Sequence, residues 1–305
     1  MSQTPVNPPS DLPRRIGLWT AIAVLVGSTI GSGIFRSPAA IADRLPGPLP
    51  LVGVWVMAGF VTLCGALTLA EMAGALPKTG GIYVFLREGW GRLVAFLFGW
   101  SQLTIIRAAA LGAIATTFAE YFLRVLGFNT QVAPYDAWVH YVAAAAIGTM
   151  ATMNILGVRF GAMIQNVTTI AKYGALLFII VLAFSLGLPE TGGNYTPLVP
   201  AGSFSIGALG LALVSVLWAF DGWADLSYVA GEVKDPRYTL PRALIGGTLA
   251  VIFIYLLANL AYLAVLDVTE IAASPLVAAD VAERVLGAGG LMFVSATVMI
   301  STLGT

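Results

Sequence analysis

The sequence has little charge. Its 305 residues include 15 Lys and Arg and 15 Asp and Glu, so charged residues make up 10% of the chain. Soluble domains carry about 25%. Hydrophobic residues make up 58% and the mean hydropathy is +0.90, which leaves too few polar groups to cover a soluble protein of this length. The net charge is zero, so no basic excess is present to bind nucleic acid, and nucleic acid is excluded as a partner.

Cysteine and histidine are almost missing. Cys64 is the single cysteine and His140 the single histidine. One cysteine excludes a disulfide framework within the chain and a cysteine-based metal cage. The sequence also shows no nucleophile–base pair, no paired catalytic carboxylates and no metal-ligand cluster. We therefore expect neither an enzyme nor a bound cofactor or metal.

Long uncharged windows are abundant. Arg44 to Glu71 leaves 26 residues without charge, and Arg242 to Asp267 leaves 24. About 20 apolar helical residues cross a bilayer, and these windows do not show the alternation of barrel strands. The sequence therefore predicts an all-α integral membrane protein embedded in the lipid bilayer. Eight spans are expected, at residues 17–43, 49–75, 91–123, 138–157, 161–188, 204–231, 243–266 and 288–305.

The Lys and Arg residues outside these spans are distributed unevenly between the two sides. One side carries nine, in the tail and in three loops: Arg14, Arg15, Lys78, Arg87, Arg92, Arg159, Lys234, Arg237 and Arg242. The other side carries three: Arg44, Arg124 and Arg284. Positive residues favour the cytoplasmic side. We expect a multi-pass protein of the plasma (cell inner) membrane with a cytoplasmic tail at 1–16, which lacks the pattern of a signal peptide.

Two of the expected spans are interrupted near their middle. Gly27–Phe35 is rich in Gly, Ser and Thr, and Trp218–Trp223 contains Asp221 and Gly222. Unwound backbone at membrane depth is tolerated where it lines a cavity or is buried in protein. Interrupted spans at matching positions of two repeats indicate a transporter's binding site. The expected units are a first five-helix repeat at 17–188, an extracellular loop at 189–203 and a partial second repeat, helices six to eight, at 204–305.

The two interruptions suit a zwitterion. The N–H groups that begin the second half of a broken helix favour a carboxylate, and the carbonyls that end the first half favour an ammonium group. An α-amino acid carries both. A packing role for Gly27 and Gly31 remains the alternative. A dinucleotide site on these glycines is disfavoured, because it needs a preceding strand.

Four ionisable residues fall inside expected spans: Arg107, Lys172, Asp221 and Asp225. Such residues are functional hypotheses by default. Asp221 could attract a substrate ammonium group or cap freed N–H groups. Lys172 could act as a tethered cation beside the broken helix, carry a proton, or extend to the interface. For Arg107 we expect pairing with a carboxylate from another segment.

At these residues the chain resembles the amino acid–polyamine–organocation superfamily and, within it, the L-type amino acid transporter-like permeases. The resemblance rests on Gly31–Phe35, on Ala70–Tyr83, on Ile106–Tyr121 and on Leu217–Trp223 with Gly231–Ala243. It implies the inverted-repeat fold of the leucine transporters. The substrate-binding residues that it implies are Thr29, Gly31, Ser32, Gly33, Ile34, Trp218, Ala219 and Asp221. It also implies that Lys172 replaces a sodium ion, with Ser301 facing it.

Four departures from that family qualify the expectation. Asp221 stands where several L-type relatives have glycine, which favours cationic substrates, and Arg36 follows the first motif, where it could line an outer vestibule. Residues 124–137 contain no cysteine, so no disulfide-linked heavy subunit is expected. The chain ends at Thr305, inside the eighth span, which suggests a truncated sequence.

The resulting prediction is a secondary-active amino acid transporter that works by alternating access, through sodium-independent exchange or proton-linked uptake. The alternatives are a polyamine or cationic amino acid antiporter and a non-transporting fragment.

Overall fold

The computed structural model describes residues 13–156, 171–200 and 204–303. Within these residues the chain forms helices and turns without a strand. One isolated β-bridge joins Ile16 to Val233 and ties the start of the first helix to a distant loop. An all-helical chain with several long apolar helices fits the predicted class of integral membrane protein. Among the described residues, four helices are long and apolar enough to cross a membrane, and a bent helix pair gives a fifth candidate. The sequence predicted eight spans over the whole chain.

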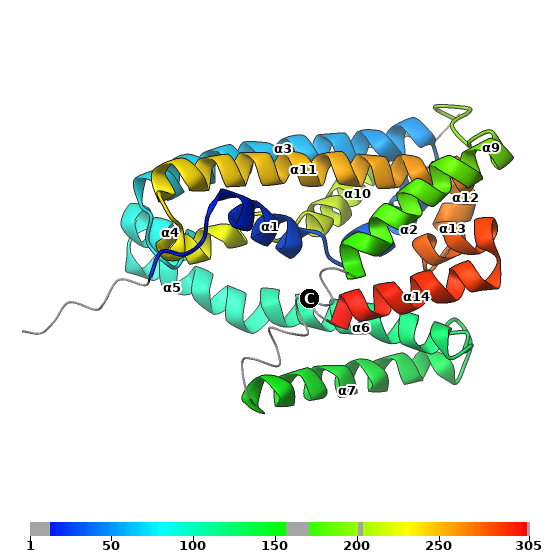
Figure 1. The fold of residues 1–305 in the computed structure, drawn as a ribbon, viewed down its shortest axis with the longest axis horizontal. Helices are drawn as coiled ribbons and strands as arrows, with labels where there is room; N and C mark the ends of the chain where they lie inside the picture. Colours follow the sequence, from blue (N-terminus) through cyan, green and yellow to red (C-terminus); the bar gives the residue numbers. More distant parts are fainter. Residues whose placement is uncertain (1–12, 157–170, 201–203, 304–305) are drawn as a thin grey trace, which may run out of the picture.

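A pair of long helices lies along one side of the molecule (Figure 1). α3 (Pro48–Ala75) and α11 (Pro236–Val265) run side by side along most of its length (Figure 1). Both begin with proline, which fits a first helical turn because its missing N–H would have no partner there. α11 begins at Pro236, seven residues before the predicted start of this span at 243. The prediction used Arg242 as a boundary, whereas the helix continues through it.

A second layer lies beneath this pair. α5 (Arg92–Ser101) passes through a π-helical turn, η1 (Gln102–Ile106), into α6 (Arg107–Val125). α7 (Tyr135–Leu156) and α14 (Ala288–Leu303) both pack against α6 (Figure 1). The contact between α6 and α7 is a separate small core, made of Ala115, Ala119, Leu123, Val139 and Ala143. The expected spans 91–123, 138–157 and 288–305 are therefore helical over their described parts.

Shorter elements cap the two ends of the bundle. α4 (Ile82–Trp90) lies at one end, and α12 (Val268–Ala273) and α13 (Val277–Leu286) lie at the other (Figure 1). The helical segment Ala171–Thr191 ends through η2 (Ala183–Gly187) and α9 (Leu188–Thr191). The first part of the expected fifth span, 161–170, lies outside the described residues. α12 begins with a capping box in which Asp267 and Glu270 satisfy each other's backbone N–H groups.

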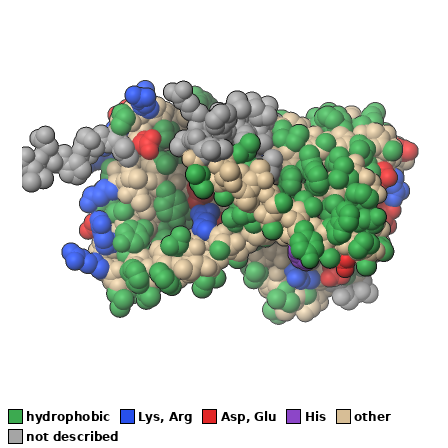
Figure 2. All heavy atoms as spheres, turned by 90° about the horizontal axis from the view of Figure 1, so that it is seen from below, with side chains coloured by type: hydrophobic (Ala, Val, Ile, Leu, Met, Phe, Trp, Pro, Cys, Tyr) green, Lys and Arg blue, Asp and Glu red, His purple; other side chains and the backbone are tan. Residues whose placement is uncertain are grey.

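The surface agrees with a membrane environment. Hydrophobic side chains cover much of the face shown in Figure 2, while Lys and Arg side chains gather at one end. Large apolar side chains such as Trp19, Phe60, Leu103 and Tyr141 are exposed. A soluble protein rarely exposes contiguous apolar patches of this extent, so lipid is the environment that this surface fits.

Both predicted interruptions are present. α1 (Leu18–Thr29) and α2 (Gly33–Arg44) are separated at residues 30–32 and bent by 45°. α10 (Ile206–Ala219) ends where the sequence predicts, and turns lead to the 3₁₀ helix η3 (Asp225–Glu232).

The two interruptions pack against each other through glycine. A Cβ atom at Gly33 would lie 2.6 Å from the Cα atom of Ala219. Gly222 has a φ of 107°, and a Cβ atom there would lie 2.6 Å from the carbonyl oxygen of Ser28. Side chains larger than hydrogen are therefore excluded where the two broken helices cross.

Replacing Gly222 with alanine should destabilise the protein, because the new methyl group meets backbone and the residue needs a positive φ. The expected loss is about 1–3 kcal/mol, typical of overpacking, with a lower apparent Tm in detergent. Gly112→Ala is the matched control, since a Cβ atom on this helical glycine meets nothing within 4 Å. Equal Tm values for the Gly222 variant and the parent would contradict the close crossing.

Candidate functional site

A central cavity of about 490 Å³ lies where the two interrupted helices meet α6. It extends along α1 from Thr29 to Thr20, towards the end of the bundle that carries α4. The volume lies within the usual range of small-molecule pockets. Eight of the residues predicted to form the site line this cavity: Thr29, Gly31, Ser32, Gly33, Lys172, Trp218, Ala219 and Asp221.

Two predicted residues do not line the central cavity. Ile34 is fully buried, and its carbonyl oxygen accepts a hydrogen bond from the Tyr262 hydroxyl at 3.3 Å. Ser301 is fully buried on α14. Ile34 follows the turn by one residue, so its side chain points into the core although its neighbours Ser32 and Gly33 reach the cavity.

The start of α2 offers hydrogen-bond donors to the cavity. Gly33 and Ile34 begin this twelve-residue helix, where backbone N–H groups lack partners within the helix, whereas the N–H of Phe35 already donates to the carbonyl oxygen of Ser32 at 3.2 Å. The Ser32 hydroxyl makes no hydrogen bond to another described residue, whereas the Thr29 hydroxyl donates to the carbonyl of Leu25 at 2.9 Å. Ser32 is therefore the hydroxyl at this turn that is available to a carboxylate.

A tyrosine on α11 contacts both interruptions. The Tyr255 hydroxyl on α11 lies 2.9 Å from the carbonyl oxygens of both Thr29 and Ala219, the last residues of α1 and α10. Its ring packs edge-on against Trp55 and Phe220, with centroids 5.4 and 5.0 Å away. The sequence analysis missed Tyr255. Its signal was a hydroxyl in the middle of the uncharged window 243–266, where a buried tyrosine needs a hydrogen-bond partner.

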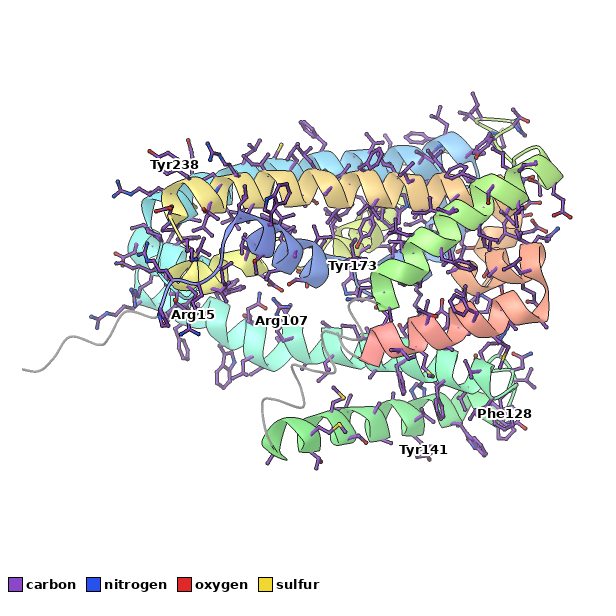
Figure 3. The ribbon with its side chains drawn as sticks, viewed as in Figure 1. Arg15, Arg107, Phe128, Tyr141, Tyr173 and Tyr238 are labelled. Atoms are coloured by element: carbon purple, nitrogen blue, oxygen red, sulfur yellow. The ribbon has the colours of Figure 1, made fainter. Side chains whose placement is uncertain are left out.

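Lys172 lies behind the end of α1. It is 2% exposed, and its Nζ atom donates to the carbonyl oxygen of Gly27 at 3.4 Å. This places a cation among the carbonyls that end the first half of the broken helix. The neighbouring Tyr173 lies close to the end of α1 in Figure 3. Extension to the membrane interface, one of the alternatives for Lys172, does not occur.

Arg107 separates the two intramembrane aspartates. Its Nη2 atom lies 2.9 Å from Oδ1 of Asp225, and its Nη1 atom lies 3.9 Å from Oδ2 of Asp221. Figure 3 shows Arg107 pointing from α6 into the space towards α1. The expected pairing of Arg107 with a carboxylate is confirmed, and its positive charge offsets the repulsion between the aspartates.

Asp221 is the less restrained of the two aspartates. Its side chain is 56% exposed and lines the cavity, and it accepts no hydrogen bond from a described backbone N–H group. The capping role is therefore not the arrangement observed. The carbonyl of Trp218 accepts the N–H of Asp221 at 3.1 Å. An ammonium group near Trp218 would consequently meet carbonyl oxygens and the Asp221 carboxylate together.

Arg36 lies beyond the far end of this cavity. Its Nη2 atom is 3.1 Å from Oε1 of Glu120 on α6, and its Nη1 atom donates to the Thr117 hydroxyl at 3.3 Å. Arg36 and Glu120 also line a second cavity of about 320 Å³, together with residues around α12. The expectation that Arg36 could line a vestibule agrees with this position.

Comparison with known proteins identifies the family. The family model described as amino acid permease matches residues 16–305. The chain is 35% identical over 277 residues to b(0,+)-type amino acid transporter 1 of Homo sapiens, covering 91% of this chain and 56% of that protein. It is 33% identical over 296 residues to the serine/threonine exchanger SteT of Bacillus subtilis (strain 168), covering 97% and 65%. It is 34% identical over 282 residues to large neutral amino acids transporter small subunit 2 of Homo sapiens, covering 90% and 52%.

The chain thus spans between about half and two thirds of the length of these relatives. The match to the family model covers almost the whole described chain, including both interrupted helices and the cavity between them. The chain therefore belongs to the amino acid permease family of the amino acid–polyamine–organocation superfamily.

Proposed function

We propose that the protein transports α-amino acids across the membrane by alternating access, with the central cavity as its binding site. The observation that carries this proposal is the pairing of opposite binding groups in one cavity. The start of α2 and the free Ser32 hydroxyl suit a carboxylate, and the end of α10 with Asp221 suits an ammonium group. The relatives named as amino acid transporters support the same function.

The proposal extends to the architecture of the whole transporter. We infer an inverted-repeat fold in which residues 17–188 form the first repeat and 204–305 contribute to the second, joined by an extracellular loop at 189–203. The interruptions of α1–α2 and of α10–η3 occupy equivalent positions in such repeats. The end of the bundle that carries most Lys and Arg residues then faces the cytoplasm, and the protein lies in the plasma membrane with a cytoplasmic N-terminus.

The exposed Cys64 lies on α3, far along the chain from residues 124–137, so no disulfide-linked heavy subunit is proposed.

Transport is proposed to be independent of sodium. The Lys172 ammonium group already occupies the carbonyl side of the α1 interruption, at 3.4 Å from the oxygen of Gly27. A fixed positive charge there removes the need for a bound metal cation and repels one. Exchange or proton-linked uptake remains as the coupling mode, with Ser301 as the proposed partner residue of Lys172 in the bundle.

The test of this function is uptake of labelled amino acids by purified protein in liposomes. Uptake is expected from a panel of neutral and cationic amino acids, and replacing sodium with choline should leave the rate within about twofold. Lys172→Ala should abolish most uptake, because it leaves buried carbonyls without their cation. Lys78→Ala, an exposed lysine at the end of α3, is the control. No uptake or binding across the panel would refute the proposed function.

A matched pair of hydroxyl variants tests the carboxylate site. Ser32→Ala should raise the KM for amino acids about tenfold, as expected for the loss of a hydrogen bond to a charged group. Thr29→Ala should change KM much less, because the Thr29 hydroxyl bonds to its own helix. Radiolabelled uptake at a series of substrate concentrations measures both. A larger effect of the Thr29 variant would show that the carboxylate lies elsewhere.

A cationic amino acid or polyamine is the second candidate substrate. It is favoured by the exposed Asp221 carboxylate, which Arg107 holds only at 3.9 Å, and by the neighbouring Asp225. A second cationic group on the substrate could approach Asp221 more closely than Arg107 does. This candidate differs from the first in the substrate's side chain and keeps the same cavity.

Competition experiments separate the two substrate classes. If Asp221 binds a cationic side chain, excess arginine or putrescine should inhibit uptake, and Asp221→Asn should weaken this inhibition about tenfold. Uptake of neutral amino acids by the same variant should change little. Asp136→Asn, an exposed carboxylate at the start of α7, is the control. Unchanged inhibition in the Asp221 variant would exclude this residue from side-chain recognition.

A further inference from the structure

Two helices connect the central cavity with the second cavity. On α2, Ser32 and Gly33 line the former, and Arg36 with Ala40 lines the latter. On α6, Ile114 lines the central cavity and Glu120 lines the second, and Thr117, which accepts a hydrogen bond from Arg36, lies three residues from each. Residues spaced by three or four share one helix face. The two cavities are therefore consecutive sections along the same pair of helix faces.

The Arg36–Glu120 ion pair lies at the boundary between these sections. Besides the 3.1 Å contact between the two charges, Arg36 also donates to Thr117, which is fully buried one turn before Glu120. The side chain of Glu120 is 15% exposed and that of Arg36 is 41% exposed. The pair joins α2 to α6 at the boundary between the two cavities.

Opening this boundary would separate the two charges. Separation is unfavourable for Glu120 above all, because its side chain is 15% exposed and would lose its counter-ion, whereas the Arg36 side chain is 41% exposed and stays accessible to water. A zwitterion can prevent this loss, since its carboxylate can pair with Arg36 and its ammonium group with Glu120. The two groups of an α-amino acid are bonded to the same carbon atom, which matches two side-chain charges that lie next to each other. Arg is well suited to carboxylate because its guanidinium donates two parallel hydrogen bonds.

The remaining walls of the second cavity fit a small amino acid. They consist of small residues, Ala39, Ala40 and Ala272 to Ala273, and of the polar residues Gln131 and Ser274. The volume of about 320 Å³ lies at the lower end of the range for ligand pockets. Among the residues that line this cavity there is no large aromatic side chain and no group of three or more His, Cys, Asp or Glu side chains that could hold a metal ion.

We propose that the second cavity is an additional, transient amino acid site, in which Arg36 binds the substrate carboxylate and Glu120 binds the ammonium group. Occupation of this site replaces the ion pair with two substrate contacts and so permits α2 to move away from α6. The inference rests on the proposed function, because the ligand is the transported amino acid. It adds a site outside the central cavity. It also explains why the separation of α2 from α6 would require a substrate that carries both a carboxylate and an ammonium group.

Protection of a cysteine tests this site directly. Ala40→Cys, introduced together with Cys64→Ser, places a single thiol on the wall of the second cavity, where Ala40 is exposed. A membrane-impermeant thiol reagent is applied to protein in liposomes with and without each neutral amino acid of the uptake panel. The amino acid should slow labelling about tenfold, whereas acetate or methylamine, each with one charge, should not. Glu190→Cys on α9, outside the cavity at the same end of the bundle, should be labelled equally in all cases.

Four further variants separate this site from its surroundings. Arg36→Gln and Glu120→Gln should each abolish the protection. Arg124→Gln should retain it, because Arg124 forms a comparable ion pair with Asp280 one turn further along α6 and lines neither cavity. Ser32→Ala should also retain it, since that hydroxyl belongs to the central cavity.

Each outcome decides between the proposals. Uptake without protection in the parent protein overturns the second site and leaves the transport function intact. Protection without uptake refutes the transport function and leaves the second site intact. Protection that persists in both the Arg36 and Glu120 variants, or that is lost equally in the Arg124 variant, overturns the assignment to this ion pair.

Discussion

The structure depends on the way in which two interrupted helices satisfy their backbone groups inside a membrane protein. Carbonyl and N–H groups that leave a helix need partners, because lipid supplies none. The Tyr255 hydroxyl meets the carbonyls that end both α1 and α10, and Lys172 meets the carbonyl of Gly27. Glycine at 33 and 222 then lets the two backbones touch. The backbone and side-chain groups at the interruptions that have no such partner face one cavity. The interruptions therefore cost stability and also form the proposed binding site.

α6 organises the charges around this crossing. Arg107, Glu120 and Arg124 lie along the helix and pair respectively with Asp225 on η3, Arg36 on α2 and Asp280 on α13. Each partner belongs to a different element, so one helix holds three others by ion pairs. Asp280 lies on the short helix α13, outside the long apolar helices, and burial raises the pKa of its carboxyl group. The hydrogen bond that Ser274 donates to this carboxyl and the positive charge of Arg124 both lower the pKa. α6 therefore acts as the common support against which the interrupted helices are placed.

Much of the local structure followed from the sequence. Uncharged windows of bilayer length located the helices. The Gly, Ser and Thr cluster at Gly27–Phe35 located the first interruption, and Asp221 with Gly222 located the second, each to within a few residues. Helix limits were less accurate where charge was used as the boundary, as at Arg242, because a helix can pass the interface with a charged residue in its first turns. The π-helical turn Gln102–Ile106 gave no signal, since its residues have ordinary helical propensity and only packing decides such a turn.

Sequence alone determined the membrane class, the positions of the interrupted helices and eight residues that line one cavity, because apolar length and glycine content are local properties. Tertiary structure decided which of these polar groups already have a hydrogen-bond or ion-pair partner within the protein. Only the fold shows that Thr29 bonds within its own helix while Ser32 does not, and that Arg107 stands between two aspartates. Only the fold brings Tyr255 to both interruptions and Arg36 to Glu120, because these contacts join residues 36 to 226 positions apart, and no local pattern encodes such pairs.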